Sequence, residues 1–306
     1  MTGQGRERER ERERQEGEAR FVRVDGRAVH VRASGSGPLA VLSGGLGCCW
    51  FDWDAVVPLL EPHRTVVRFD RPGHGLSQPS PEPPTACGEA DRIAALLDGL
   101  VREKVVDGPD AEAPVTVVGH SIAAFHVEAF ARLHPERTAA LVLLDGSTEP
   151  GARPAPARAV RDLTARTVGA VLAAAGLPYL LGPSARRAMA AATTLGHRDP
   201  APAELVRRCY RTGRMLRSVL AENTRYLDVA AELDALRRTT ALRAPALVLA
   251  AAARPGGRWL ARQRELADLL GAEYREAVPA GHLLMWDRPE TVAAAVLDAP
   301  QVRRPG

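Results

Sequence analysis

The sequence predicts an α/β fold in which a mostly parallel sheet is covered by helices on both faces. Several short apolar runs show no alternation of polar and apolar residues, which is typical of strands buried on both faces. Helix-forming segments lie between these runs, and a repeated strand, helix, strand order indicates an open α/β sheet. At 306 residues with 45% hydrophobic content, the chain suits one enlarged domain or a domain with an insertion.

The predicted elements begin at Phe21. The strand segments read, in order, FVRVDG, AVHVRASG, LAVLSGG, VVRFD, VTVVG, ALVLLDG and ALVLAAA, followed by a short strand over residues 274–278. The predicted helices of this part cover residues 54–60, 89–105, 122–133, 258–270 and 290–297. We therefore predict a core formed by residues 21–148 and 241–300.

Residues 149–240 interrupt this core, because the strand pattern disappears there. The segment is rich in Ala, Leu and Arg and is broken by Pro178, Pro183 and Pro200, so we predict a helical insertion. Its most apolar stretch, residues 168–181, is shorter than the ~20 residues that cross a bilayer. We expect a buried or pocket-lining helix there and no membrane span.

The first 20 residues have a different composition. Residues 6–14 read RERERERER, so in a helix the i,i+4 neighbours would carry like charges. With almost nothing apolar to bury, residues 1–20 are predicted to be a disordered charged tail. The N-terminus lacks the apolar core of a secretory signal, and we expect a cytoplasmic location.

Charge and cysteine content exclude several classes of function. The net charge is +4, but basic and acidic residues are interleaved, which is a poor footprint for nucleic acid. Cys48, Cys49, Cys87 and Cys209 lack metal-ligand spacing and are expected to be reduced thiols. No macromolecular partner is indicated, and the oligomeric state is left open.

The candidate nucleophile is Ser121, in PVTVVGHSIAAF at residues 114–125. A serine between a buried strand and a helix presents its hydroxyl at the carboxyl edge of the sheet, where helix N–H groups favour developing negative charge. The turn is crowded and needs small neighbours, which Gly119, Ala123 and Ala124 provide. Here the chain resembles the α/β-hydrolase family, whose GxSxG elbow becomes Gly-His-Ser-Ile-Ala. The resemblance implies an eight-stranded sheet and a helical cap formed by residues 149–240.

The same resemblance suggests an oxyanion hole. LSGGLG at residues 42–47 stands where the family has its oxyanion loop, with Gly44 in place of the family's His. The donors needed are backbone N–H groups, so the implied pair is the amides of Leu46 and Ile122. FDRPGHGLS at residues 69–77 matches a structural turn of the family, and we assign no catalytic role to His74.

His282 is the best candidate for the general base among the eight histidines. It follows the last short strand and precedes the final helix, where the family keeps its catalytic histidine. The alternative is an ordinary loop histidine. His120 and His126 are expected to shape the pocket or to pack.

The acid is less obvious, because the family's usual position aligns with Arg254. Asp145 ends the strand after the nucleophile's strand and helix, where some family members carry their acid, and it preserves the order Ser, acid, His. Its alternative role is to cap the turn that follows. Glu149 on the same loop is the rival acid, and an acid-free dyad is the third possibility.

These residues together imply a serine hydrolase that acts on an ester, thioester or related acyl substrate, a small molecule, through an acyl-enzyme. No metal or organic cofactor is needed. A serine nucleophile argues against the epoxide-hydrolase and dehalogenase branches, which use Asp. Perhydrolase, carbon–carbon hydrolase or lyase chemistry uses the same triad, and a non-catalytic ligand-binding protein remains the alternative from another class.

Overall fold

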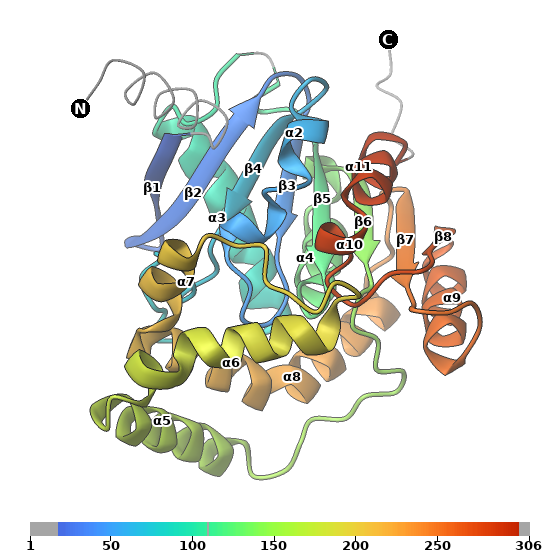
Figure 1. Ribbon diagram of the computed structural model, residues 1–306. Helices are drawn as coiled ribbons and strands as arrows, with labels where there is room; N and C mark the ends of the chain where they lie inside the picture. The colour runs from blue at the N-terminus through green and yellow to red at the C-terminus, as the bar shows by residue number, and fades with distance from the viewer. Residues whose placement is uncertain (1–17, 109, 300–306) are drawn as a thin grey trace.

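The computed structural model describes residues 18–108 and 110–299, which form an eight-stranded sheet with the order β1-β2-β4-β3-β5-β6-β7-β8 (Figure 1). The strands are β1 (Glu18–Val24), β2 (Arg27–Gly35), β3 (Leu39–Ser43), β4 (Thr65–Phe69), β5 (Val115–His120), β6 (Thr138–Leu144), β7 (Ala246–Ala251) and β8 (Glu273–Ala277). β2 runs antiparallel to both of its neighbours, and all other neighbouring strands are parallel. The predicted mostly parallel, eight-stranded sheet is confirmed.

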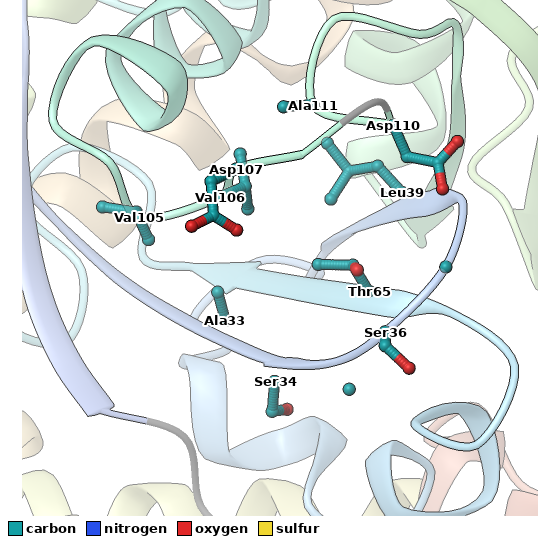
Figure 2. A pocket seen from close by; sticks show the side chains of 12 residues that line it. Ala33, Ser34, Ser36, Leu39, Thr65, Val105, Val106, Asp107, Asp110 and Ala111 are labelled. Carbon is teal, nitrogen blue, oxygen red and sulfur yellow. The ribbon is translucent and has the colours of Figure 1, made fainter.

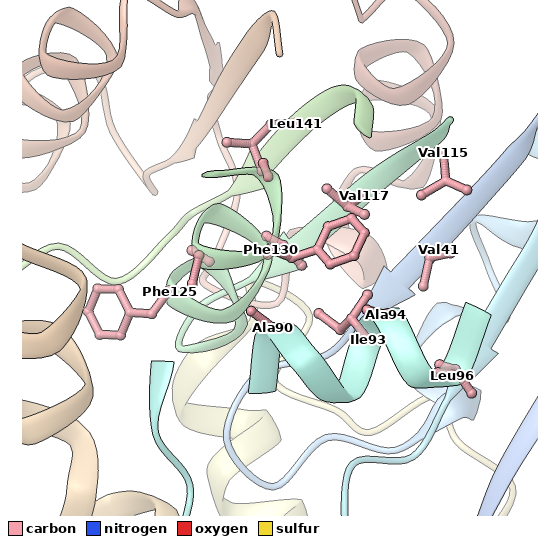
Figure 3. Packing of buried hydrophobic residues seen from close by; sticks show 14 of the residues in the cluster. Val41, Ala90, Ile93, Ala94, Leu96, Val115, Val117, Phe125, Phe130 and Leu141 are labelled. Carbon is pink, nitrogen blue, oxygen red and sulfur yellow. The ribbon is translucent and has the colours of Figure 1, made fainter. Parts of the chain in front are cut away.

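The core has two layers, one on each face of the sheet. One face packs against α3 (Ala86–Arg102), α4 (Ala123–Leu133) and α9 (Arg258–Leu270), and the other against α2 (Val57–Leu60), α10 (Leu284–Asp287) and α11 (Pro289–Leu297). Successive strand residues enter opposite layers, as Val41 and Leu42 do. Figure 3 shows the first layer, where Phe130 of α4 and Ile93 of α3 lie against Val117 of β5.

Two predicted helix starts differ from the structure by three residues. The helix expected over 89–105 begins at Ala86, because the Thr85 hydroxyl caps it by accepting a hydrogen bond from the Gly88 N–H at 2.9 Å. The helix expected over 54–60 begins only at Val57, as α2, and a 3₁₀ turn, η1 (Trp50–Trp53), lies before it. Pro58 lies in the first turn of α2, where its missing N–H costs no helical hydrogen bond.

The fold begins three residues earlier than predicted. Residues 18–20 extend β1, whose Glu18–Arg20 segment pairs with residues 31–33 of β2, so they do not belong to the predicted tail. The rest of the predicted disordered tail, residues 1–17, lies outside the described residues. A second short 3₁₀ turn, η2 (Pro135–Arg137), leads from α4 into β6.

Four helices lie between β6 and β7 in the chain, and Figure 1 shows them gathered at one edge of the sheet, with α5 outermost. They are α5 (Arg158–Ala174), α6 (Leu177–Thr193), α7 (Ala203–Tyr210) and α8 (Gly213–Thr239). We refer to residues 149–240 as the insertion.

The prediction of one buried or pocket-lining helix over residues 168–181 is wrong, because two helices share this stretch. Gly176, at φ 73°, separates α5 from α6, and Val171, Leu180 and Leu181 are each more than half exposed. Apolar composition alone did not indicate which face of each helix packs on the rest of the insertion. Within the described residues, only α5 and α6 taken as a pair have the length and apolarity of a membrane span, with a bend of 105° between them; no single helix does.

Candidate active site

Ser121 lies in the sharp turn between β5 and α4 and has a left-handed backbone, with φ 56°. This conformation is strained for a residue with a side chain and aims the hydroxyl out of the sheet edge. The turn also requires glycine at position 119, because a Cβ there would lie 2.5 Å from Val127 Cγ2 and 2.7 Å from the Ala123 carbonyl oxygen. The glycine predicted for this turn is therefore needed for steric reasons.

The turn that follows β6 packs directly against this elbow. The Ser121 N–H donates to the Leu144 carbonyl at 3.2 Å, and the Ser147 N–H donates to the Ser121 carbonyl at 3.0 Å. A Cβ on Gly146 would lie 2.8 Å from the Ala124 Cβ. Because the two turns share hydrogen bonds and close contacts, Asp145 is held at a fixed position relative to Ser121.

Ser121, His282 and Asp145, which we call the Ser-His-Asp trio, are brought together by three separate loops. His282 Nε2 lies 2.9 Å from Ser121 Oγ, and His282 Nδ1 lies 2.6 Å from Asp145 Oδ2. The Asp145 side chain is almost completely buried, whereas the His282 side chain is 37% exposed. The arrangement allows the imidazole to take a proton from the hydroxyl while the carboxylate orients the ring.

The second oxygen of Asp145 is held by the end of β7 and the start of α9. Asp145 Oδ1 accepts hydrogen bonds from the Ala251 N–H at 2.9 Å and from Trp259 Nε1 at 2.6 Å. Arg254, at the family's usual acid position, is exposed. The segment from the end of β7 to the start of α9 lacks an acid of its own. It instead supplies two donors to the carboxylate that follows the neighbouring strand, β6.

Glu149, the rival acid, makes a different contact. Its Oε1 accepts a hydrogen bond from the Tyr226 hydroxyl of α8 at 3.2 Å. The carboxylate that contacts His282 is that of Asp145.

The loop that carries His282 is fixed on both sides. His120 Nε2 lies 2.9 Å from the His282 carbonyl oxygen, and the two rings are 4.7 Å apart between centroids. Burial lowers the pKa of His120 well below its ordinary value, and the neighbouring His282 lowers it further. A neutral His120 can therefore donate to the carbonyl without adding charge. On the other side, the Gly281 N–H donates to Asp287 Oδ2 at 2.7 Å.

The predicted oxyanion loop packs against the elbow. A Cβ on Gly45 would lie 2.8 Å from His120 Nδ1 and 2.9 Å from Ser121 Cβ, so this position needs glycine for close approach. Leu46 follows directly, and Ile122 is the N-cap residue of α4. Their amides as oxyanion donors stay a prediction.

The turn after β4 is organised around the buried Asp70. Its Oδ1 accepts from the Trp50 N–H at 3.0 Å, and its Oδ2 accepts from the Leu76 N–H at 3.0 Å. A Cβ on Gly75 would lie 2.2 Å from this carboxyl group. His74 is fully buried beside Glu222 of α8. These contacts agree with a structural turn and give His74 no access to the trio.

Several residues near the site had no role in the sequence prediction. Trp259 donates to Asp145, Tyr210 donates to the Gly47 carbonyl at 2.5 Å, and Arg71 donates to the carbonyls of Gly44 and Gly45. Arg71 is part of the FDRPGHGLS motif. That motif was the one signal in the sequence that could have pointed to it. The contacts of Trp259 and Tyr210 depend on folding of distant segments and have no local signature.

The described residues contain no group of three or more His, Cys, Asp and Glu side chains that could hold a metal ion. The four cysteines are free thiols. A cavity of about 280 Å³ is lined by residues that include Ser34, Thr65 and Asp107, whose side chains are labelled in Figure 2. It lies beside the first residues of β3 and β4, opposite the sheet edge where β5 leads into Ser121.

The chain belongs to the Alpha/beta hydrolase family, because the model of that family matches residues 39–295. The family predicted from the elbow and its surroundings is thereby confirmed. No curated protein matches the chain.

Solved structures share this fold over most of their length. Cfl2 from Burkholderia cenocepacia is 24% identical, with a TM-score of 0.70, and the match covers 92% of this chain and 94% of that one. The enol-lactonase from Burkholderia xenovorans LB400 is 25% identical, with a TM-score of 0.62 and coverage of 91% and 98%. An esterase from Thermogutta terrifontis is 19% identical, with a TM-score of 0.64 and coverage of 92% and 97%.

Proposed function

We propose that this protein is a serine hydrolase that cleaves an ester, thioester or related acyl bond of a small molecule through an acyl-enzyme. The observation that carries the proposal is the continuous contact from Ser121 Oγ to His282 Nε2, at 2.9 Å, and from His282 Nδ1 to Asp145 Oδ2, at 2.6 Å. Nucleophile, base and orienting acid are thus within hydrogen-bond reach in the order that acyl transfer requires.

In the first step, His282 takes the proton of Ser121 as its oxygen attacks the acyl carbon. The negative charge that develops on the carbonyl oxygen is met by the amides of Leu46 and Ile122, and one such donor is typically worth about 3 kcal/mol in the transition state. His282, held by Asp145, then returns the proton to the leaving group, and the acyl group stays on Ser121.

In the second step, the same imidazole removes a proton from water, which attacks the acyl-enzyme and releases the acid. Asp145 stays ionised and keeps the Nδ1 proton of His282 in place during both steps. No group outside this chain is needed to balance the reaction apart from substrate and water. We propose that the insertion acts as a cap over the site and selects the substrate.

The choice of an ester-like substrate has support beyond the serine nucleophile. The enol-lactonase from Burkholderia xenovorans LB400 is named for a lactone, which is a cyclic ester. CorEH, an epoxide hydrolase with a TM-score of 0.71, is 18% identical and shares the fold alone. Serine at position 121 favours acyl transfer over epoxide opening, for which the family uses aspartate.

Labelling with a fluorophosphonate probe tests the proposal. The wild type should react with the probe, whereas Ser121→Ala and His282→Ala should not. A screen of p-nitrophenyl esters of increasing chain length would then define the acyl group that the protein accepts. A folded wild type that resists the probe and hydrolyses none of these esters would contradict the proposal and favour a ligand-binding role. Labelling without hydrolysis would instead favour perhydrolase, carbon–carbon hydrolase or lyase chemistry.

A further inference from the structure

Arg71, in the turn after β4, contacts the predicted oxyanion loop from behind. The side chain is buried, with an exposed fraction of 3%. Its Nη2 donates to the Gly45 carbonyl at 2.8 Å, and its Nη1 donates to the Gly44 carbonyl. A buried guanidinium that donates hydrogen bonds to two backbone carbonyls of one loop fixes the direction of those peptide groups.

The peptide between residues 45 and 46 connects this contact to the reaction. It carries both the Gly45 carbonyl and the Leu46 N–H, which point in opposite directions because the peptide is trans. The Gly45 carbonyl accepts from Arg71 and also from the Cys48 N–H at 3.0 Å. With its oxygen held by a cation and an amide, this peptide presents a better-aligned and more polarised N–H on the side opposite Arg71.

Glu222 of α8 holds Arg71 in this position. Its two oxygens accept from Arg71 Nε and Nη2, each at 2.8 Å, and His74 Nε2 lies 3.6 Å away. Burial opposes ionisation of Glu222, but Arg71 and His74 outweigh it and lower the pKa of this carboxyl to about 2. The ionised carboxylate satisfies the buried guanidinium and joins the insertion to the oxyanion loop.

We propose that Arg71 is a positioning residue of the oxyanion site, and that Glu222 makes this function depend on the docking of α8. This inference rests on the proposed acyl-transfer function. Arg71 orients and polarises the Gly45–Leu46 peptide, whose N–H stabilises charge that is present only in the transition state. Removing Arg71 should therefore lower kcat and leave KM nearly unchanged.

The main test replaces the whole ion pair, because removing one partner would leave a buried charge unpaired. The double variant Arg71→Met/Glu222→Leu removes both charges. Arg225→Met/Asp162→Leu is the matched control, since Arg225 also lies on α8, is buried and pairs with Asp162 at 2.7 Å, away from the oxyanion loop. Arg71→Lys is the milder variant, which keeps the charge but not the forked geometry.

Two readouts separate positioning from folding. The first is kcat and KM for a p-nitrophenyl ester, and the second is inhibition by a trifluoromethyl ketone, whose serine adduct carries an oxyanion. Complete loss of one oxyanion donor costs about 10²–10³ in kcat, so misalignment in the double variant should cost about 10- to 100-fold. Affinity for the ketone should fall in parallel, KM should change by less than about threefold, and Arg71→Lys should lie between wild type and double variant.

The outcomes distinguish the two proposals. Suppose that the wild type reacts with the fluorophosphonate but Arg71→Met/Glu222→Leu or Arg71→Lys keeps its kcat and ketone affinity. This result would overturn the role of Arg71 and leave the proposed function standing. The same holds if both double variants lose kcat and ketone affinity equally. A wild type that the probe does not label would overturn the proposed function and this inference with it.

Discussion

Two groups of polar residues lie close to the elbow, and they differ in their exposure to solvent. The Ser-His-Asp trio includes a histidine side chain that is 37% exposed. The second group, which we call the buried polar cluster, consists of Arg71, His74, His126 and Glu222, each no more than 5% exposed. The trio is partly open to solvent, whereas the cluster forms where α8 of the insertion packs on the core and is shielded from water.

The difference shows where function and stability are separated in this fold. The trio side chains contact one another, the Ala251 N–H and Trp259, so changes that keep their shape should affect turnover much more than unfolding. The buried cluster consists of groups that must be paired or neutral to stay inside, so changes in it should affect unfolding and its pH dependence. Arg71 connects the two groups, because it belongs to the cluster and contacts the predicted oxyanion loop.

The largest expected effect is that of Asp145→Asn. The amide oxygen would take the position of Oδ1, which accepts from the Ala251 N–H and Trp259 Nε1, and its NH₂ group would face His282 Nδ1. The ring would then adopt the wrong tautomer and present an N–H to Ser121. We expect kcat to fall by about 10⁴, or about 5 kcal/mol, with little change in thermal unfolding. Ester hydrolysis within tenfold of wild type would show that the trio works without its carboxylate.

The next effect concerns the stability of the fold and the buried polar cluster, through His126. Burial lowers the pKa of His126 from its ordinary 6.5 to about 4; Glu89 and Glu222 oppose this shift, and Arg71 and Arg92 add to it. The unfolded chain therefore binds more protons than the folded chain between pH 6.5 and pH 4. The stability from keeping His126 neutral is present above pH 6.5 and is lost as the pH falls to 4, by about 3 kcal/mol.

Urea unfolding of wild type and His126→Leu at pH 7.5 and pH 4.0 measures this loss. The variant should lose about 3 kcal/mol less than the wild type on acidification. His63→Leu, at an exposed position, is the control and should follow the wild type. Equal acid losses in wild type and His126→Leu would mean that His126 is not kept neutral by burial.

A smaller effect on turnover is expected for Trp259→Phe. This change removes one of the two donors to Asp145 Oδ1 and leaves the Ala251 N–H in place. A hydrogen bond to a charged group is typically worth about 1.5–3 kcal/mol, and part of that should appear as misorientation of His282, so kcat should fall about tenfold. Trp286→Phe is the matched control, because Trp286 donates to the Asp52 carbonyl instead. If the two variants were equally active, the anchoring of Asp145 by Trp259 would not matter for turnover.

The fold and the elbow could be predicted because their signals are local. A strand buried on both faces needs a continuous apolar run, and the crowded turn between strand and helix needs a glycine at position 119. The chain order of Ser121, Asp145 and His282 was likewise available, since the family resemblance gave each a place in the sequence.

The buried cluster and the exposed insertion helices could not be predicted, because their properties depend on packing between distant segments. Glu222 meets Arg71 across 151 positions in the chain, and no spacing rule connects a turn in the core with a helix in the insertion. The apolar residues near Gly176 read as buried by composition, but the bend between α5 and α6 turns Val171 and Leu180 to the outside. Apolar content predicts which segments form helices better than it predicts which face is covered.

The acid was the one member of the trio for which the sequence left a rival, and Glu149→Gln should have the smallest effect. Glu149 accepts from the Tyr226 hydroxyl at 3.2 Å, and glutamine can accept the same hydrogen bond through its amide oxygen. Esterase activity should therefore stay within about twofold of wild type. The free energy of unfolding should change by less than about 0.5 kcal/mol. The measurement is kcat for a p-nitrophenyl ester beside Asp145→Asn. If Glu149→Gln were instead the variant that lost turnover, His282 would have to leave Asp145 and pair with Glu149 during the reaction.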